Sequence, residues 1–175
     1  MRIIGLAGWS GSGKTTLLTK VIPVITGRGL TVSTIKHAHE GFDTDRPGKD
    51  SFRHRAAGAT EVLVSSSARF ALIHELRGAA EPSFAELIDK LAAVDLLLVE
   101  GYKREPHPKL EVHRLANGKP LIHPDDPYVV AIAADGPLPQ AKVPVVKLDD
   151  IDAIVEILLA KAADVAALKL GPRGL

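Results

Sequence analysis

Apolar and polar positions follow two patterns along the chain, and their order is typical of an α/β protein. Short runs rich in Val, Ile and Leu predict strands at residues 2–7, 31–36, 61–64, 69–73, 95–99, 109–113, 128–133 and 143–146. Apolar residues at helical spacing or helix-start residues predict helices at residues 14 to about 26, 52–57, 82–91 and 151–167. We expect Ser51 to cap the second of these helices and Asp149 the last.

The order of these elements predicts a parallel sheet. Residues 2–36 run strand, glycine-rich turn, helix and strand, which is a βαβ unit whose crossover should be right-handed. The run at residues 95–99 is continuously apolar after its first residue, as in a strand buried on both faces. We therefore predict one domain over residues 1–175 with an α/β, P-loop NTPase-like fold. Its central sheet should be mostly parallel and flanked by helices, with some antiparallel strands.

Residues 8–15, GWSGSGKT, have the P-loop pattern of glycines five positions apart followed by Lys and Thr. The glycines let successive backbone N–H groups turn toward a β-phosphate, Lys14 reaches the β- and γ-oxygens, and Thr15 offers a hydroxyl to Mg²⁺. The helix that begins at Lys14 directs its positive end toward the same phosphates. The pattern predicts that a nucleoside triphosphate contacts Gly8, Ser10, Gly11, Ser12, Gly13, Lys14, Thr15 and Thr16.

A carboxylate at the end of a neighbouring strand commonly completes the metal site of such a loop. The segment LLLVEG at residues 96–101 places Glu100 at the end of the most apolar strand. We therefore predict that Thr15 and Glu100 hold Mg²⁺. The alternative is that Glu100 is a solvated charge at a strand end.

The long polar segment KHAHEGFDTDRPGKDSFRHR, residues 36–55, follows the predicted βαβ unit. Ligands of parallel α/β sheets lie beyond the carboxyl ends of the strands, so the position favours function. His37 and His39 point the same way in an extended segment and form a candidate metal pair, although a third ligand is missing. The segment also supplies the catalytic candidates Asp43, Asp45 and Asp50 for orienting water and the anion-binding candidates Arg53 and Arg55.

A guanine base is commonly read by the carboxylate of an Asn-Lys-x-Asp motif, which this sequence lacks. Residues 147–149, KLD, reproduce its end, but Asp149 is better explained as a helix cap. Asp135 follows the strand at residues 128–133, where such a carboxylate should emerge. We prefer Asp135 as the residue that contacts the base.

Composition adds three exclusions. Lys and Arg number 22 against 21 Asp and Glu, so no overall field attracts nucleic acid or an anionic membrane. The chain has no cysteine, which excludes disulfides and thiolate metal sites and suits a reducing compartment. The apolar N-terminal run is too short for a secretion signal, and no other run reaches membrane-spanning length. We expect a cytoplasmic protein that binds neither nucleic acid nor a membrane.

The sequence resembles the MobB family of molybdopterin-guanine dinucleotide biosynthesis adapter proteins over nearly its whole length. The resemblance rests on GWSGSGKTTL, IKHAHEGFDTDRPGKDSFRHRAAGA, LLLVEGYK and AIAADGP. It implies a GTP-binding, usually dimeric protein with at most weak GTPase activity. Such a protein assists a separate guanylyltransferase that makes the guanine dinucleotide form of the molybdenum cofactor. GTP, Mg²⁺ and molybdopterin would then be its ligands.

Two other functions fit parts of the sequence. A P-loop kinase of small metabolites would use the basic segment as a substrate-binding lid and should turn over quickly. A metallochaperone GTPase would carry a metal such as nickel on His37 and His39, although the sequence has no His-rich tail or cysteine pair.

Overall fold

The computed structural model describes residues 1–38 and 41–170, and the chain divides into two compact units. The first unit comprises Met1–His37 and Phe84–Leu175, and the second comprises Ala38–Ser83. The sequence-based expectation of a single domain over residues 1–175 stays a prediction.

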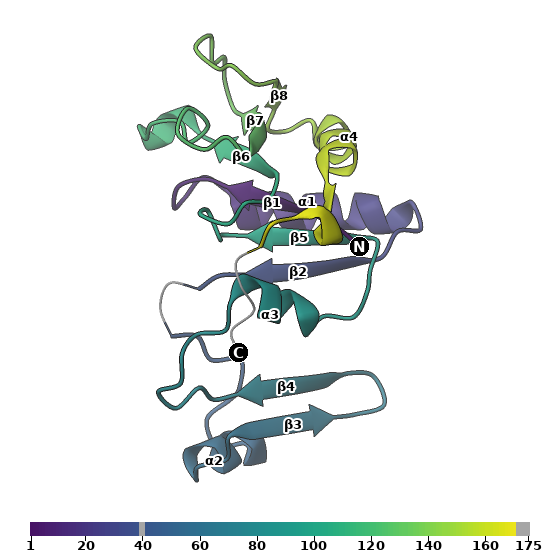
Figure 1. The fold of residues 1–175 in the computed structure, drawn as a ribbon, viewed down its shortest axis with the longest axis vertical. Coiled ribbons are helices and arrows are strands. Elements are labelled where there is room, and N and C mark those ends of the chain that lie inside the picture. Colours follow the sequence, from purple (N-terminus) through teal and green to yellow (C-terminus); the bar gives the residue numbers. More distant parts are fainter. Residues whose placement is uncertain (39–40, 171–175) are drawn as a thin grey trace. The chain divides into compact units, whose positions relative to one another are not determined.

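The first unit carries the parallel sheet and its helices (Figure 1). Its elements are β1 (Arg2–Ala7), α1 (Lys14–Gly27), β2 (Val32–Lys36), α3 (Phe84–Asp89), β5 (Leu96–Glu100), β6 (Lys109–His113), the 3₁₀ turn η1 (Leu115–Asn117), β7 (Val129–Ala134), β8 (Val145–Lys147), α4 (Ile151–Lys161), β9 (Ala163–Asp164) and η2 (Val165–Ala167). The second unit contains α2 (Asp50–Ala56), β3 (Glu61–Ser65) and β4 (Phe70–His74).

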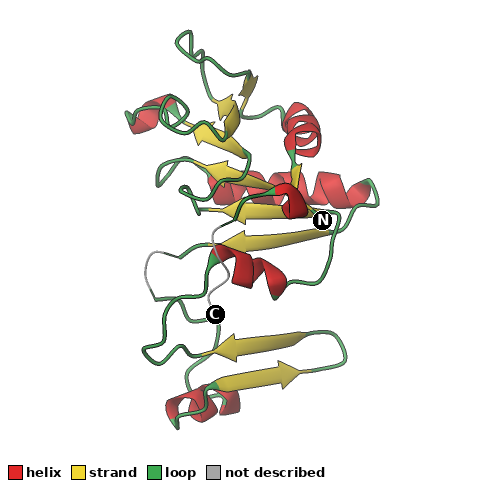
Figure 2. Cartoon of the chain, in the orientation of Figure 1, coloured by secondary structure: helices red, strands yellow, loops and turns green. Residues whose placement is uncertain are grey.

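The sheet has the strand order β2-β5-β1-β6-β7-β8, and every neighbouring pair along this path is parallel. The predicted α/β fold with a mostly parallel sheet flanked by helices is therefore confirmed (Figure 2). β5 lies between β1 and β2, so the first βαβ unit encloses a third strand. The register between β1 and β5 places Glu100 beside Leu6. All parallel strands end at one edge of the sheet, which is where chemistry is expected in such folds.

Alternate residues of each central strand pack on opposite faces of the sheet. Ile4 and Leu98 belong to the larger core, where α1 and α4 cover the sheet. Ile3 and Val99 belong to a second core, which α3 and η2 cover. Because both faces are buried, the strand residues read as continuous apolar runs rather than as an alternating pattern.

The C-terminal part of the first unit differs from the predicted helix over residues 151–167. α4 ends at Lys161, because Ala162 adopts an extended conformation, and Ala163 then pairs antiparallel with Ile3 of β1. Val165 and Leu168 continue the apolar spacing but pack on the opposite face of the sheet from α4. The prediction from apolar periodicity alone therefore made the last helix too long.

Two predicted helix caps are also wrong by one or two residues. The N-cap of α2 is Lys49, and Ser51 lies inside the helix, where its hydroxyl donates to Asp45 Oδ1 at 2.8 Å. The N-cap of α4 is Asp150, whose Oδ1 accepts a hydrogen bond from Ala153 N at 3.1 Å. Asp149 is thus not the cap.

Two ionisable side chains are buried at the start of β6. Lys109 is fully buried, and its Nζ donates to the Glu105 carbonyl at 2.7 Å and lies 3.2 Å from Asp126 Oδ2. His107 is also fully buried, and within the described part of the chain neither ring nitrogen has a hydrogen-bond partner. Burial, and then the nearby Lys109 charge, lower the pKa of His107 to about 4.

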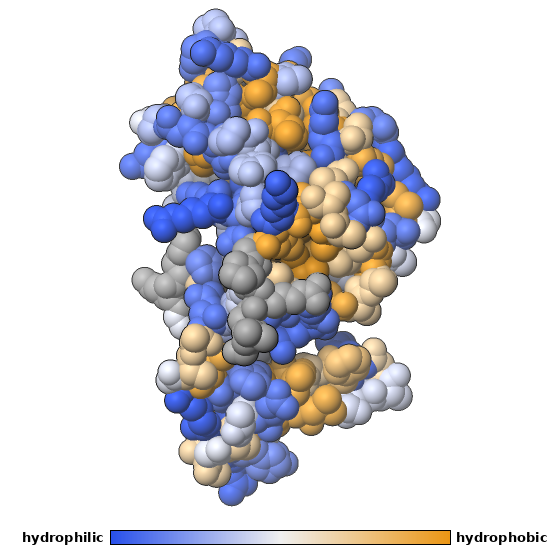
Figure 3. Space-filling view, viewed as in Figure 1, coloured by the Kyte–Doolittle hydropathy of each residue, from blue (hydrophilic) through white to orange (hydrophobic). Residues whose placement is uncertain are grey.

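In the second unit, β3 and β4 form an antiparallel hairpin. α2 contacts β3, and Val62 on this strand is buried. The opposite face carries Leu63, Phe70 and Leu72, which are 61%, 73% and 52% exposed. Figure 3 shows hydrophobic side chains gathered on this hairpin. An apolar face of this kind is unusual on an isolated soluble unit and marks a candidate contact surface.

Among the helices of residues 1–38 and 41–170, none has the length and apolar character needed to cross a membrane.

Candidate functional site

The loop between β1 and α1, residues 8–13, is called the glycine-rich loop below. A Cβ on Gly8 would lie 2.6 Å from the Val112 carbonyl oxygen, so a larger residue would collide with the backbone of β6. Gly13 has a φ of +93°, a left-handed conformation that favours glycine, directly before the first residue of α1. The local geometry therefore requires glycine at both ends of the loop.

Lys14 folds back over this loop. Its Nζ donates to the carbonyl oxygens of Gly8 and Trp9, each at 3.0 Å. Partial burial lowers the pKa of Lys14, and the nearby carboxylate of Glu100 opposes this effect. The ammonium thus lies within the turn of the loop, close to any anion that the loop would bind.

Thr15 and Glu100 meet beside the loop. Thr15 Oγ1 donates to Glu100 Oε1 at 2.8 Å, and Lys36 Nζ lies 3.4 Å from the same oxygen. Glu100 is only 8% exposed, so its carboxylate is held against the hydroxyl. A hydroxyl and a carboxylate are the oxygen ligands that Mg²⁺ prefers, with phosphate and water completing its shell. The donor set fits the predicted metal site, which stays a prediction.

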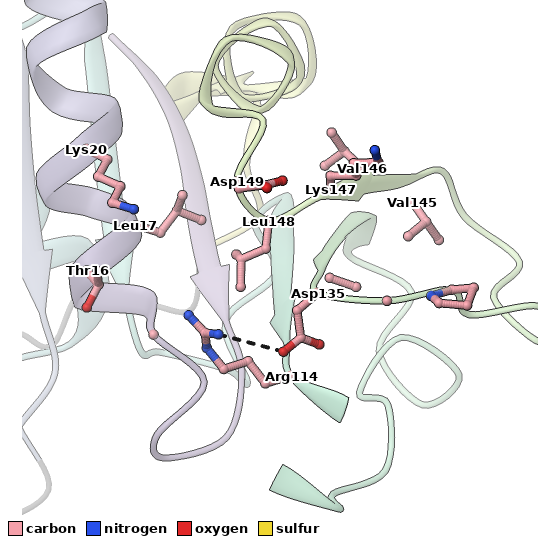
Figure 4. Close-up of a pocket in the computed structure, with 14 residues that line it drawn as sticks. Thr16, Leu17, Lys20, Arg114, Asp135, Val145, Val146, Lys147, Leu148 and Asp149 are labelled. Atoms are coloured by element: carbon pink, nitrogen blue, oxygen red, sulfur yellow. Dashed lines mark ion pairs between the residues drawn. The ribbon is translucent and has the colours of Figure 1, made fainter. Parts of the chain in front are cut away.

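An open pocket of about 560 Å³ begins at the glycine-rich loop and extends to the ends of β7 and β8. Figure 4 shows Thr16 and Lys20 of α1 on one side, and Asp149 and Lys147 on the other. Its volume falls within the range of roughly 300–1,000 Å³ that is common for small-molecule sites. Thr16, a predicted phosphate contact, lines this pocket.

Asp135 lies in the same pocket, but its carboxylate is partly occupied. Its Oδ1 accepts a hydrogen bond from Leu115 N at 2.9 Å, and its Oδ2 lies 3.7 Å from Arg114 Nη1 (Figure 4). These contacts join the loop after β7 to the residues after β6. The role of Asp135 in contacting a base stays a prediction.

In the second unit, Arg55 is enclosed by carboxylates. Its guanidinium contacts Asp43 at 2.9 Å, Asp45 at 3.3 Å and Glu75 at 2.7 Å, and its side chain is only 14% exposed. The hydrogen bonds to Glu75 and Asp43 raise the pKa of Arg55 further above its usual value. In turn, the Asp45 backbone and Arg55 lower the pKa of Asp43. These contacts attach the polar loop to α2 and to the residue after β4, and they leave Arg55 few donors for another anion.

Arg53 and Asp50 form a looser pair on α2. They lie 3.8 Å apart, and their side chains are 75% and 87% exposed. Arg53 is therefore the more accessible of the two predicted anion-binding arginines. The catalytic roles proposed for Asp43, Asp45 and Asp50 stay predictions.

The predicted histidine pair is only partly described. His37 follows β2, its backbone N–H donates to the Glu100 carbonyl at 2.9 Å, and its ring lies 4.8 Å from that of Tyr102. His39 lies outside the described residues. Across residues 1–38 and 41–170, no group of three or more His, Asp or Glu residues is arranged to hold a metal ion.

A family model described as "Molybdopterin guanine dinucleotide synthesis protein B" matches residues 3–135 of this sequence. The chain belongs to the MobB family. The matched residues include the glycine-rich loop, Glu100 and the whole second unit. The family resemblance inferred from the sequence is thereby confirmed.

Relatives within the MobB family cover most of the chain. A protein of Haemophilus influenzae is 42% identical over 137 residues, which span 78% of this chain and 76% of the relative. A protein of Escherichia coli strain K12 is 37% identical over 160 residues, or 90% of this chain and 91% of the relative. Both are described as molybdopterin-guanine dinucleotide biosynthesis adapter proteins.

Solved MobB structures share the fold. The crystal structure of Bacillus subtilis MobB superposes with a TM-score of 0.73 at 24% identity, covering 93% of this chain and 99% of that one. A crystal structure described as molybdopterin-guanine biosynthesis protein B gives a TM-score of 0.72 at 24% identity, covering 90% and 98%. At this identity the likeness shows the fold alone.

Sequence reasoning did not single out three basic residues near the loop. Lys36 contacts Glu100, Arg114 Nε donates to the Ser12 carbonyl at 3.2 Å, and Lys20 lines the pocket. A signal for two of them was present, since Lys36 ends a predicted strand and Arg114 follows another. Carboxyl ends of parallel strands meet at one edge, so both residues were candidates for the site.

Proposed function

We propose that this MobB-family chain binds GTP with Mg²⁺ and acts as an adapter in molybdopterin guanine dinucleotide synthesis. The observation that carries this proposal is the hydrogen bond between Thr15 and Glu100, next to Lys14, which folds back over the glycine-rich loop. A hydroxyl and an ammonium at the start of α1, together with a buried carboxylate at the end of β5, form the constellation that a P-loop needs for a metal-bound triphosphate.

In this proposal the phosphates rest on Gly8, Ser10, Gly11, Ser12 and Gly13, with Thr16 at the start of the pocket. Backbone N–H groups of the loop and the N-terminal end of α1 favour negative charge there. The adjoining pocket has room for a nucleoside, since it extends from Gly13 to the end of β8. Support for guanine comes from the family, because its description names molybdopterin guanine dinucleotide synthesis and this dinucleotide contains the base.

The adapter role requires a partner enzyme. We propose that the partner is the guanylyltransferase that joins the guanine nucleotide to molybdopterin. The two relatives are described as adapter proteins, which supports an adapter rather than a complete enzyme. Molybdopterin carries a phosphate, so exposed Arg53 remains a candidate contact for it, whereas Arg55 is held by three carboxylates.

We also propose that the chain forms a homodimer through the open face of the β3–β4 hairpin. Leu63, Phe70 and Leu72 lie together on this face and are more than half exposed. Covering them with a second copy removes apolar surface from water, which is the main favourable term in association. Within the described chain the long edges of the two-stranded hairpin also remain unpaired, and open edges favour strand pairing.

The proposed function is tested with the guanylyltransferase, molybdenum-loaded molybdopterin and Mg²⁺-GTP. Addition of this chain should raise the yield of dinucleotide, and the Lys14→Ala variant should lose the effect. The variant should also bind GTP at least about tenfold more weakly by calorimetry, because the loop loses its side-chain cation. The matched control is Lys90→Ala, which removes an exposed lysine that follows α3. Equal stimulation by parent and Lys14→Ala proteins, both folded, would contradict the proposal.

A further inference from the structure

The short loop between β8 and α4 contributes a carboxylate to the nucleotide-sized pocket. Leu148 and Asp149 line the pocket from this loop, Gly13 lines it from the glycine-rich loop, and Thr16 lines it from α1. A nucleotide whose phosphates occupy the glycine-rich loop must direct its sugar and base away from the loop. The pocket provides a hollow for them, and Asp149 stands on its far side from Thr16 (Figure 4).

Capping of α4 does not use the Asp149 side chain. The cap is Asp150, whose Oδ1 accepts from Ala153 N at 3.1 Å. From Asp149 only the backbone carbonyl takes part, accepting from Ile151 N at 3.0 Å. No residue within 1–38 or 41–170 forms a side-chain hydrogen bond or an ion pair with the Asp149 carboxylate. Both of its oxygens therefore remain available to a ligand.

Asp135, the other carboxylate of the pocket, is in a different situation. One of its oxygens accepts from Leu115 N at 2.9 Å, and the other lies 3.7 Å from the Arg114 guanidinium. A carboxylate that receives two parallel hydrogen bonds from a planar ligand needs both oxygens on the same side to be free. Asp149 meets this condition, whereas Asp135 would first have to give up its contacts.

We infer that Asp149 is the residue that selects guanine in this pocket. The inference rests on the proposed function, because it takes GTP as the ligand. Guanine presents N1–H and an exocyclic amine side by side, so one carboxylate accepts both as charge-assisted hydrogen bonds. Adenine has an acceptor nitrogen in place of N1–H and carries a hydrogen instead of an amine at C2, so the N1 lone pair would face the negative carboxylate. Asp149 thus attracts guanine and repels adenine, which discriminates between the two bases more strongly than attraction of guanine alone.

The walls of the pocket suit the rest of the base. Leu17, Val146 and Leu148 supply apolar surface on both sides of the Asp149 position (Figure 4). Ligand pockets commonly combine such apolar walls with a few placed polar groups that decide specificity. Here the walls accept any purine, and the carboxylate distinguishes among purines.

The test compares Asp149→Asn with the parent protein for binding of Mg²⁺-loaded GTP, ITP, XTP and ATP by calorimetry. ITP lacks the exocyclic amine, and XTP carries a carbonyl in its place. The parent should prefer GTP to ITP by about tenfold and to ATP by more, since each charge-assisted bond is worth about that factor. In Asp149→Asn the preference for GTP over ITP should disappear. XTP should bind more tightly than it does to the parent, because the asparagine amide can donate to its carbonyl.

Two matched variants make the same chemical change nearby. Asp150→Asn retains a good capping residue and should keep the parent's preference for GTP over ITP. Asp135→Asn should keep it as well. If Asp135→Asn removes the preference and Asp149→Asn retains it, the inference is overturned in favour of Asp135.

The failures of the inference and of the proposed function are distinguishable. A parent protein that binds GTP but does not prefer it to ITP overturns the role of Asp149, whatever the variants do. The same conclusion follows if Asp149→Asn keeps the parent's selectivity. A parent protein that binds none of the four nucleotides overturns the proposed function, and the role of Asp149 with it.

Discussion

At the scale of single residues, the contacts of Glu100 decide what its substitution should do. Its carboxylate accepts from Thr15 at 2.8 Å and lies 3.4 Å from Lys36 Nζ. A metal-binding role and a purely structural ion pair both fit these contacts. The two roles predict that GTP binding by a Glu100 variant depends on Mg²⁺ in different ways.

We expect Glu100→Gln to weaken GTP binding by about tenfold in Mg²⁺ and to leave binding in EDTA nearly unchanged. Glutamine keeps the size of the side chain and removes the charge that would hold the metal. Calorimetry under the two conditions measures the difference. Lys36→Met is the control, since it removes the ion pair and leaves the carboxylate. A loss of similar size with and without Mg²⁺ would assign Glu100 a structural role only.

The buried imidazole of His107 should make stability depend on pH. Its pKa is lowered from 6.5 to about 4 in the folded protein, mainly by burial. Between these values the unfolded chain binds a proton that the folded chain does not, so stability falls as pH decreases through this window. A shift of this size corresponds to roughly 3 kcal/mol of stability lost near pH 4.

Denaturant unfolding at pH 7 and pH 4.5 checks this expectation. His107→Gln should lose less stability between the two pH values than the parent does, because glutamine does not titrate. His54→Gln makes the same change at an exposed position of α2 and should behave like the parent. If the three proteins lose equal stability on acidification, the buried His107 is not the source of the effect.

At the scale of elements, the β3–β4 hairpin shows one covered and one open face. Its register pairs Leu63 with Leu72 and Ser65 with Phe70, so the exposed apolar side chains gather on one side. α2 contacts the hairpin through β3, where Val62 is buried. A hairpin this short is marginal alone and gains stability when its apolar face is packed.

We expect Leu72→Asp to convert the proposed dimer to a monomer, because it places a charge in the centre of the contact face. Sedimentation velocity measures the change, and circular dichroism checks that the fold is retained. Leu115→Asp is the matched control, since Leu115 is 49% exposed and Leu72 is 52% exposed. A dimer that survives Leu72→Asp, or a parent protein that is monomeric at high concentration, would rule out this interface.

At the scale of the whole molecule, the contacts of the candidate catalytic groups bear on turnover. Phosphoryl transfer needs a group that positions the attacking nucleophile and usually a further cation on the phosphates. In the second unit, Asp43, Asp45 and Arg55 satisfy one another. These groups therefore use most of their hydrogen-bonding capacity on one another.

We therefore expect the isolated protein to hydrolyse Mg²⁺-GTP far more slowly than about 1 s⁻¹, the lower end of typical enzyme turnover. Phosphate release at saturating GTP measures the rate, and Lys14→Ala gives the background from contaminating enzymes. Turnover above about 1 s⁻¹ with a small-molecule acceptor and no partner protein would favour a kinase instead.

The sequence by itself determined the features that depend on local pattern. Residue type and spacing predicted the glycine-rich loop, the helix after it and the buried strand that ends at Glu100. The same motifs predicted membership of the MobB family. Continuous apolar runs also specified a sheet covered on both faces, because each strand residue must be buried on one side or the other.

Only the tertiary structure decided which distant segments meet. The short pairing of Ala163 with β1, the ion pair between Lys36 and Glu100, and the enclosure of Arg55 join positions whose separation carries no periodic signal. The sequence also led to the wrong choice between adjacent Asp149 and Asp150 for the cap of α4, because an aspartate suits a cap at either position. Backbone geometry assigns the cap to Asp150, and this places the Asp149 carboxylate on the pocket.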